Sequence, residues 1–80
     1  MYLHINKDCV IKDSDIIGIF PMKNIKNTKE FKDIFDNLKI VNLAVNNEKT
    51  FILTKENNEY IGYILKINIY TIKRRIQGRK

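Results

Sequence analysis

The N-terminal part of the chain alternates between apolar and polar positions and then becomes continuously apolar. In "YLHI", Leu3 and Ile5 would share one face of a half-buried strand. The turn residues "NKD" at 6–8 and the apolar "CVI" at 9–11 predict that the chain returns as a hairpin. The run "IIGIF" at 16–20 predicts a strand that is covered on both faces and is therefore central in its sheet.

A second hairpin is predicted over residues 50–65. In "TFILT", Phe51 and Leu53 face one side of the strand, and the residues around them face the other. The loop residues "ENNE" separate this strand from its predicted partner at 60–65. The apolar segment at 40–45 predicts a further strand before this hairpin.

Residues 27–38 carry the clearest helical pattern. Four apolar residues recur at i, i+3, i+4 and i+7 and would share one face: Phe31, Ile34, Phe35 and Leu38. Asn27 is the predicted N-cap, and Glu30 follows it at the spacing of a capping box. The preceding segment at 22–27 is rich in lysine and asparagine, so we expect a loop there.

The C-terminal part of the chain fits two patterns. Alternation from Leu65 to Ile69 suits a strand. Ile69, Ile72 and Ile76, however, have the i, i+3, i+7 spacing of a helix, and Asn68 is placed to cap it. We favour a short helix whose apolar stripe packs on the sheet. Three cations would then lie on or near its exposed side: Lys73, Arg74 and Arg75.

The order strands, helix, strands, short helix predicts one small α+β domain over residues 1–76, followed by a basic tail at 77–80. We expect a mainly antiparallel β-sheet with one central helix and a short C-terminal helix. A chain of 80 residues buries only a modest core. Association into dimers or larger assemblies is therefore an expected way to bury more apolar surface.

Positive charge is concentrated toward the C-terminus. The formal net charge is +6, and residues 73–80 hold five basic residues and no acidic ones: Lys73, Arg74, Arg75, Arg79 and Lys80. Residues 1–72 hold ten lysines against nine acidic residues, so this part is nearly neutral. A localised basic patch attracts phosphate backbones. The simpler interpretation is a charged end that keeps a small protein soluble.

Cysteine content and the length of the apolar runs predict a cytoplasmic protein without a membrane partner. Cys9 is the only cysteine, whereas a secreted domain of this size usually carries paired cysteines. The N-terminal segment lacks the long apolar run of a signal peptide, and no run approaches the roughly 20 residues that span a bilayer. Ile69, Ile72 and Ile76 beside the cations form a short amphipathic stripe suited to a membrane surface, which we rank below nucleic acid.

No arrangement of residues indicates catalysis or metal binding. His4 and Cys9 are single, whereas a zinc site needs about four converging ligands. The sequence has no P-loop, GxGxxG or GxSxG motif. We therefore expect neither an enzyme nor a cofactor, and we predict Cys9 to be a small buried residue. The four tyrosines are not interleaved with arginine, so we interpret them mainly as packing residues.

Three segments resemble a known bacterial family. They are "MYLHINKDCVIKDSDIIGIF", the hairpin "KTFILT…YIGYIL" and the later "NIYTIKRR". They are similar to the extracellular matrix regulatory protein B branch of the RemA/RemB family. The resemblance implies a small cytoplasmic regulator of Gram-positive bacteria. Through the A branch, it implies a DNA-binding protein that assembles into rings and activates biofilm-matrix operons by wrapping or bridging promoter DNA.

The resemblance also assigns contact positions. One arginine of the A branch falls on or beside Asp15, with Lys12 nearby. An arginine pair of that branch falls on Glu48 and Lys49, so two of these basic positions are acidic here and Lys49 keeps its charge. The segment "TIKRR" matches the B branch, which makes three cations family-like: Lys73, Arg74 and Arg75.

Our leading hypothesis is a DNA-binding transcriptional regulator that acts as a homo-oligomer, a ring or a dimer, and contacts DNA through phosphates. The expected contact residues are Lys12, Lys49, Lys73, Arg74 and Arg75. Symmetry would multiply the few contacts of one chain. The alternative is an assembly or interaction protein that binds no DNA and partners a paralogous regulator or itself. Asp15 and Glu48 favour this alternative.

Overall fold

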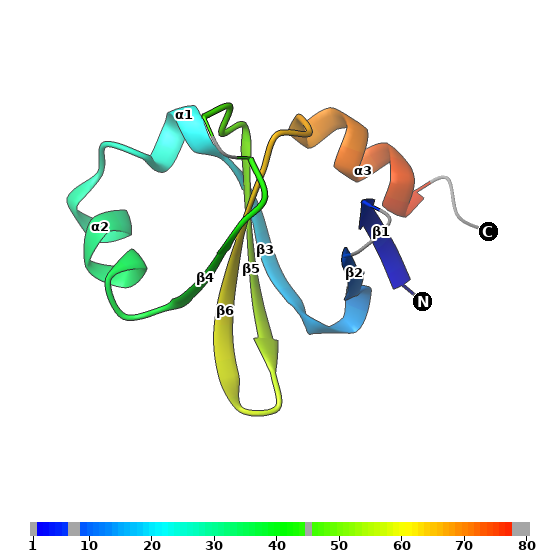
Figure 1. The fold of residues 1–80 in the computed structure, drawn as a ribbon, viewed down its shortest axis with the longest axis horizontal. Helices are drawn as coiled ribbons and strands as arrows, with labels where there is room; N and C mark the ends of the chain where they lie inside the picture. The colour runs from blue at the N-terminus through cyan, green and yellow to red at the C-terminus, as the bar shows by residue number, and fades with distance from the viewer. Residues whose placement is uncertain (1, 7–8, 45, 78–80) are drawn as a thin grey trace.

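The computed structural model describes residues 2–6, 9–44 and 46–77. Their elements are, in chain order, β1 (Tyr2–Asn6), β2 (Cys9–Lys12), the 3₁₀ helix η1 (Asp13–Asp15), β3 (Ile16–Pro21), α1 (Met22–Ile25), α2 (Lys29–Phe35), β4 (Lys39–Asn42), β5 (Thr50–Glu56), β6 (Glu59–Leu65) and α3 (Ile69–Gln77). In Figure 1 a central sheet separates α1 and α2 from the β1–β2 hairpin and α3. The predicted α+β fold is confirmed.

The strands form two sheets within the described ranges. β1 and β2 pair only with each other, antiparallel, as predicted, and residues 7–8 of their turn lie outside the described residues. The main sheet has the strand order β3-β5-β6-β4. Its β3–β5 and β5–β6 pairs are antiparallel, whereas β4 runs parallel to β6. The main sheet is therefore mainly antiparallel with one parallel edge.

Each face of the main sheet has its own hydrophobic core. Successive residues of β5 point to opposite faces, so Phe51 packs toward α1 and α2 while Ile52 packs toward the β1–β2 hairpin and α3. This confirms the alternation predicted for "TFILT". The buried residues of the hairpin-side core are Leu3, Ile5, Ile11, Ile52, Ile61, Tyr63, Leu65 and Ile72. Those of the helix-side core are Met22, Ala44, Phe51 and Ile64.

The β5–β6 hairpin turns through two asparagines. Asn57 has φ 52° and Asn58 has φ 68°, which is the left-handed backbone that asparagine tolerates better than most residues. Two such residues in succession match the right-handed twist of the flanking strands. The hairpin predicted at 50–65 is confirmed, and its strands extend to Glu56 and from Glu59, closer to the turn than predicted.

β3 lies at an edge of the main sheet, so the prediction of a central strand at 16–20 is wrong. Among the described strands it pairs only with β5. Ile17 is 54% exposed and Phe20 is 39% exposed, so neither side chain is covered as the prediction required. A continuous apolar run cannot distinguish a fully covered strand from an edge strand that leaves apolar side chains in solvent.

Helix α2 begins after Thr28, not after the predicted cap Asn27. The side-chain oxygen of Thr28 accepts a hydrogen bond from the backbone N–H of Phe31 at 3.1 Å and donates one to the Ile25 carbonyl at 2.8 Å. This second bond ties α2 to the end of α1, a one-turn helix within the segment predicted as a loop at 22–27. Thr28 is therefore both the cap of α2 and the link between the two helices.

β4 is shorter than the strand predicted at 40–45. It ends at Asn42, whose side-chain oxygen accepts a hydrogen bond from the backbone N–H of Ala44 at 2.9 Å. Asparagine side chains offer the backbone such an alternative to regular strand pairing. Residue 45, the last of the predicted strand, lies outside the described residues.

Candidate nucleic-acid interface

The predicted C-terminal helix is present as α3, and its start and buried stripe are those expected. The side-chain oxygen of Asn68 accepts a hydrogen bond from the backbone N–H of Thr71 at 3.0 Å, which satisfies one of the unpaired donors of the first turn. Ile72 is 0% exposed in the hairpin-side core, and Ile76 packs against the same core. None of the helices formed by residues 2–6, 9–44 and 46–77 is long and apolar enough to cross a membrane.

Burial of this stripe determines where the cations lie. Lys73, Arg74 and Arg75 are all exposed. Successive residues of an α-helix are about 100° apart, so Lys73 and Arg75 flank the stripe from opposite sides while Arg74 points away from it. The three charges are thus distributed around the solvent side of α3, as predicted. Within the described part of the chain, no carboxylate pairs with Lys73 or Arg74.

Arg75 is fixed against the N-terminal hairpin. Its guanidinium Nη1 donates a hydrogen bond to the backbone carbonyl of His4 at 3.0 Å. Figure 1 shows the later part of α3 beside β1. The last helix and the first strand therefore form one continuous surface.

Lys12 lies on the outward face of the hairpin, in the strand that pairs with β1. In the β1–β2 register His4 lies opposite Val10, and Lys12 lies opposite Tyr2. Lys12 and His4 are consequently diagonal neighbours, which in an antiparallel pair are about 7–8 Å apart. The outward-facing side chain of Lys12 is exposed and adds a positive charge on β2. We call Lys12, Tyr70, Lys73, Arg74 and Arg75 together the α3–hairpin surface.

Tyr70 was missed by the sequence prediction. It is 75% exposed and precedes Arg74 by one helical turn, so the phenol ring and the guanidinium lie on the same outward side of α3. The i, i+4 spacing of Tyr70 and Arg74 in the sequence is the signal that could have placed the two side chains together on a helix. An exposed aromatic ring beside cations is the arrangement on which nucleic-acid bases stack.

Lys49 is not part of the α3–hairpin surface. Its backbone carbonyl accepts a hydrogen bond from Met22 at 2.9 Å, and its backbone N–H donates one to Leu65 at 2.8 Å. These bonds hold Lys49 next to α1 and before the start of α3, at the opposite end of that helix from Arg74 and Arg75. Glu48, beside it, lines a groove on the helix side of the sheet. Arg79 and Lys80 of the predicted tail at 77–80 lie outside the described residues.

A polar network lies at the end of the hairpin-side core that is nearest the β5–β6 turn. The phenol of Tyr63 donates a hydrogen bond to Glu56 Oε2 at 2.7 Å, and the hydroxyl of Thr54 donates to the same oxygen at 2.8 Å. Burial, this hydrogen bond and the charge of Glu56 raise the pKa of Tyr63 above its ordinary value. Burial and then Glu56 also raise the pKa of Cys9, which keeps its thiol protonated and weakly nucleophilic. Tyr63 is therefore buried as predicted, whereas Tyr2, Tyr60 and Tyr70 are exposed, so the prediction that the tyrosines are mainly packing residues is wrong for these three.

The α3–hairpin surface can grip phosphates and stack against bases. Arginine offers a planar fork that binds two phosphate oxygens, and lysine supplies a compact charge. Among the residues that the structure describes, no three histidine, cysteine or acidic side chains converge on a point that could hold a metal ion. No family model, no curated protein and no solved structure matches this chain.

Proposed function

We propose that this chain is a cytoplasmic DNA-binding transcriptional regulator of the biofilm-matrix type. It acts as a homo-oligomer and contacts DNA mainly through phosphates. The resemblance of its first residues, its second hairpin and its "TIKRR" segment to the RemA/RemB family supports this class of regulator.

One observation carries the proposal. Ile72 is completely buried in the hairpin-side core, so α3 is held against the rest of the domain. Its cations consequently project from a defined surface and not from a loose end, and the bond of Arg75 to His4 ties α3 to β1, the strand that pairs with the β2 strand of Lys12. A surface of this kind neutralises several phosphates at once and releases their counterions.

One chain offers few phosphate contacts, so the proposal includes self-association. Copies that present the α3–hairpin surface side by side would raise affinity by local concentration without any new type of contact. Lys12, Lys73, Arg74 and Arg75 are the contact residues of the proposal. Lys49 is left out of it because the structure holds its backbone beside α1.

The test is fluorescence anisotropy of a labelled duplex over a range of salt concentrations. The affinity is expected to fall steeply with salt, by a slope of about 0.9 in log K per log salt for each neutralised phosphate. Replacing Lys73, Arg74 and Arg75 with alanine should weaken binding and reduce the magnitude of this salt slope by about 2 to 3. Circular dichroism of the variant checks that α3 is retained.

A matched control removes the same charge elsewhere. Lys23 in α1, Lys39 in β4 and Lys55 in β5 are exposed and lie on other elements. Their triple alanine variant lowers the net charge equally, and we expect it to keep most of the salt slope. Equal losses in the two triple variants would show that only net charge matters and would overturn the assignment of the interface.

A second candidate function is an assembly protein that contacts no DNA. It is favoured by the edge strand β3, which carries Ile17 at 54% and Phe20 at 39% exposure. Edge strands present unpaired backbone donors and acceptors that can pair with another chain. The acidic side chain of Glu48, at a position where the related A branch carries arginine, favours the same candidate.

Light scattering with and without duplex DNA separates the two candidates. Assembly without any duplex affinity at low salt would support the second candidate alone. Ile17→Lys on the β3 edge should reduce the molar mass in solution, because a lysine on an edge strand opposes pairing. Ile34→Lys is the matched control, since Ile34 is similarly exposed at 49% but lies on α2.

A further inference from the structure

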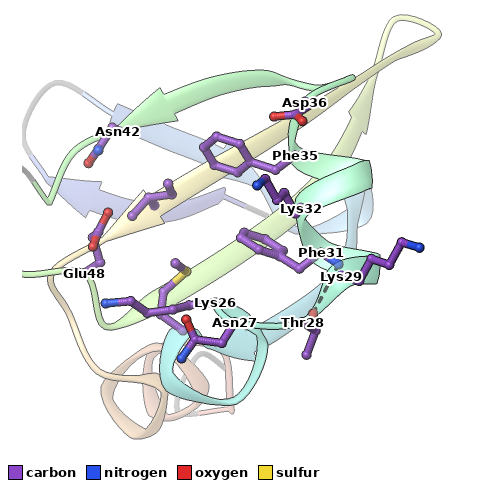
Figure 2. A pocket seen from close by; sticks show the side chains of 12 residues that line it. Lys26, Asn27, Thr28, Lys29, Phe31, Lys32, Phe35, Asp36, Asn42 and Glu48 are labelled. Carbon is purple, nitrogen blue, oxygen red and sulfur yellow. Dashed lines mark hydrogen bonds between the residues drawn. The ribbon is translucent and has the colours of Figure 1, made fainter.

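A groove of about 710 Å³ lies on the face of the main sheet opposite α3. Figure 2 shows its lining, which comes from α1, the link to α2, α2 itself, and the nearby ends of β4 and β6. This volume is within the range of about 300–1,000 Å³ that small-molecule sites occupy. Because the two faces of the sheet have separate cores, the groove is independent of the α3–hairpin surface and of the proposed function.

The floor of the groove is apolar and fixed. Met22 is 4% exposed and Ile64 is 2% exposed. The ring of Phe31 stands edge-on against the buried ring of Phe51, with centroids 5.1 Å apart at 87°, and lies 5.4 Å from the ring of Phe35. An aromatic wall held by a buried ring is already formed before a ligand arrives.

The rim of the groove carries charged side chains of both signs. Its lining includes three lysines and two carboxylates: Lys26, Lys29, Lys32, Asp36 and Glu48. In Figure 2 the side chain of Lys32 lies between the two phenylalanines of α2, whereas Lys29 points away from the groove. Lys26 lies at the far side of the opening, and Asn27 beside it adds a neutral polar group.

We propose that this groove binds a small amphipathic anion. Its hydrocarbon body lies on Met22, Phe31, Phe35 and Ile64, and its head is a carboxylate or a phosphate that Lys26 and Lys32 receive. Burial of the hydrocarbon supplies affinity at about 25 cal/mol per Å² of apolar area, and the lysine ammonium groups select the sign of the head group.

The test uses four ten-carbon probes on the ¹⁵N-labelled protein, followed by NMR chemical shifts of the backbone amides. The probes are decanoate, decyl phosphate, decanol and decylamine. Both anions are expected to shift amides of α1, α2 and the end of β6, and to bind more tightly than decanol. The tighter of the two anions identifies the head group. Decylamine binding as tightly as either anion would overturn the proposal, as would shifts scattered over the whole surface.

Variants locate the head-group contact. Lys26→Gln with Lys32→Gln should weaken the anions by about tenfold and leave decanol within about twofold, because only the charged head loses a partner. Lys29→Gln is the matched control, since Lys29 lies on α2 like Lys32 but points away from the groove. We expect it to change neither the affinity for the anions nor the affinity for decanol. Unchanged anion binding in the double variant would overturn the role of the lysines.

Discussion

The guanidinium of Arg75 donates a hydrogen bond of 3.0 Å to the backbone carbonyl of His4, across 71 residues of sequence. This bond connects the last helix to the first strand. It also orients one of the cations on which the proposed DNA contact depends.

Replacing Arg75 with alanine should therefore destabilise the protein as well as weaken DNA binding. The bond is exposed, so we expect a loss of about 0.5–1.5 kcal/mol in the free energy of unfolding, measured by urea denaturation. Arg75→Lys retains a charged donor and should recover part of that loss. Arg74→Ala is the control, because within the described residues Arg74 makes no comparable bond, and its stability should match that of the parent protein.

Tyr70 should contribute to nucleic-acid affinity and not to stability. It is 75% exposed, so Tyr70→Ala is expected to change the free energy of unfolding by less than about 0.5 kcal/mol. Stacking of one base on an aromatic ring is worth about 1–3 kcal/mol, so the same variant should lose affinity for single-stranded DNA by roughly fivefold or more. Tyr70→Phe keeps the ring and should keep the affinity. Equal losses in both variants would point to the hydroxyl instead of stacking.

Two glycines should respond differently to alanine. A Cβ at Gly62 would lie 2.6 Å from the ring of Phe51, which is 3% exposed and has no room to move. Gly62→Ala is therefore expected to cost about 1–3 kcal/mol in thermal or urea unfolding. A Cβ at Gly18 would also lie 2.6 Å from a ring, but that ring belongs to Phe20, which is 39% exposed at the sheet edge. Gly18→Ala should cost less, since Phe20 can swing into solvent.

Tyr63 should make the protein less stable at high pH. Burial and the hydrogen bond to Glu56 raise the pKa of Tyr63 above its ordinary value of about 10. Above that pH the unfolded chain releases the phenol proton while the folded protein retains it, so the free energy of unfolding falls by up to about 1.4 kcal/mol per pH unit. Tyr63→Phe removes this contribution.

The measurement compares urea midpoints of the parent and Tyr63→Phe from about pH 8 to about pH 11. Near pH 8 the variant should be the less stable protein, because it lacks the hydrogen bond to Glu56. The difference in stability between the parent and the variant should become smaller as the pH rises. Parallel curves for the two proteins would contradict the raised pKa.

The cap of α2 gives a direct comparison between the sequence prediction and the structure. Thr28→Ala removes the oxygen that accepts from Phe31, and we expect a loss of about 1 kcal/mol. Asn27→Ala should be close to neutral, although Asn27 was the cap predicted from the sequence. The reverse order of stabilities in urea denaturation would place the start of the helix one residue earlier.

Features set by local sequence were predicted well. The alternation around Phe51 predicted a strand with two distinct faces, and the structure sends those faces into separate cores. Asn68 was predicted to cap the last helix, and its side-chain oxygen does so. In both cases the signal lies within a few residues of its effect.

Features set by distant pairing were not predicted. The edge position of β3 depends on which strands pair with β5, and Ile17 carries no local sign of it. Charge and family position group Lys49 with Arg75, whereas a backbone hydrogen bond from Met22 to Lys49 and the guanidinium bond of Arg75 to His4 hold them at different ends of α3. Tyr70 could be identified only from its i, i+4 spacing to Arg74, a signal that depends on α3 being a helix.

The dependence of the first hairpin on the last helix has a consequence for biosynthesis. β1 and β2 pair with no other strand among the described residues, and an isolated two-stranded hairpin is only marginally stable in water. Leu3 and Ile11 share their core with residues from Ile52 to Ile72, all of which are synthesised later. During translation, the N-terminal hairpin is therefore expected to fold stably only after nearly the whole chain has been synthesised.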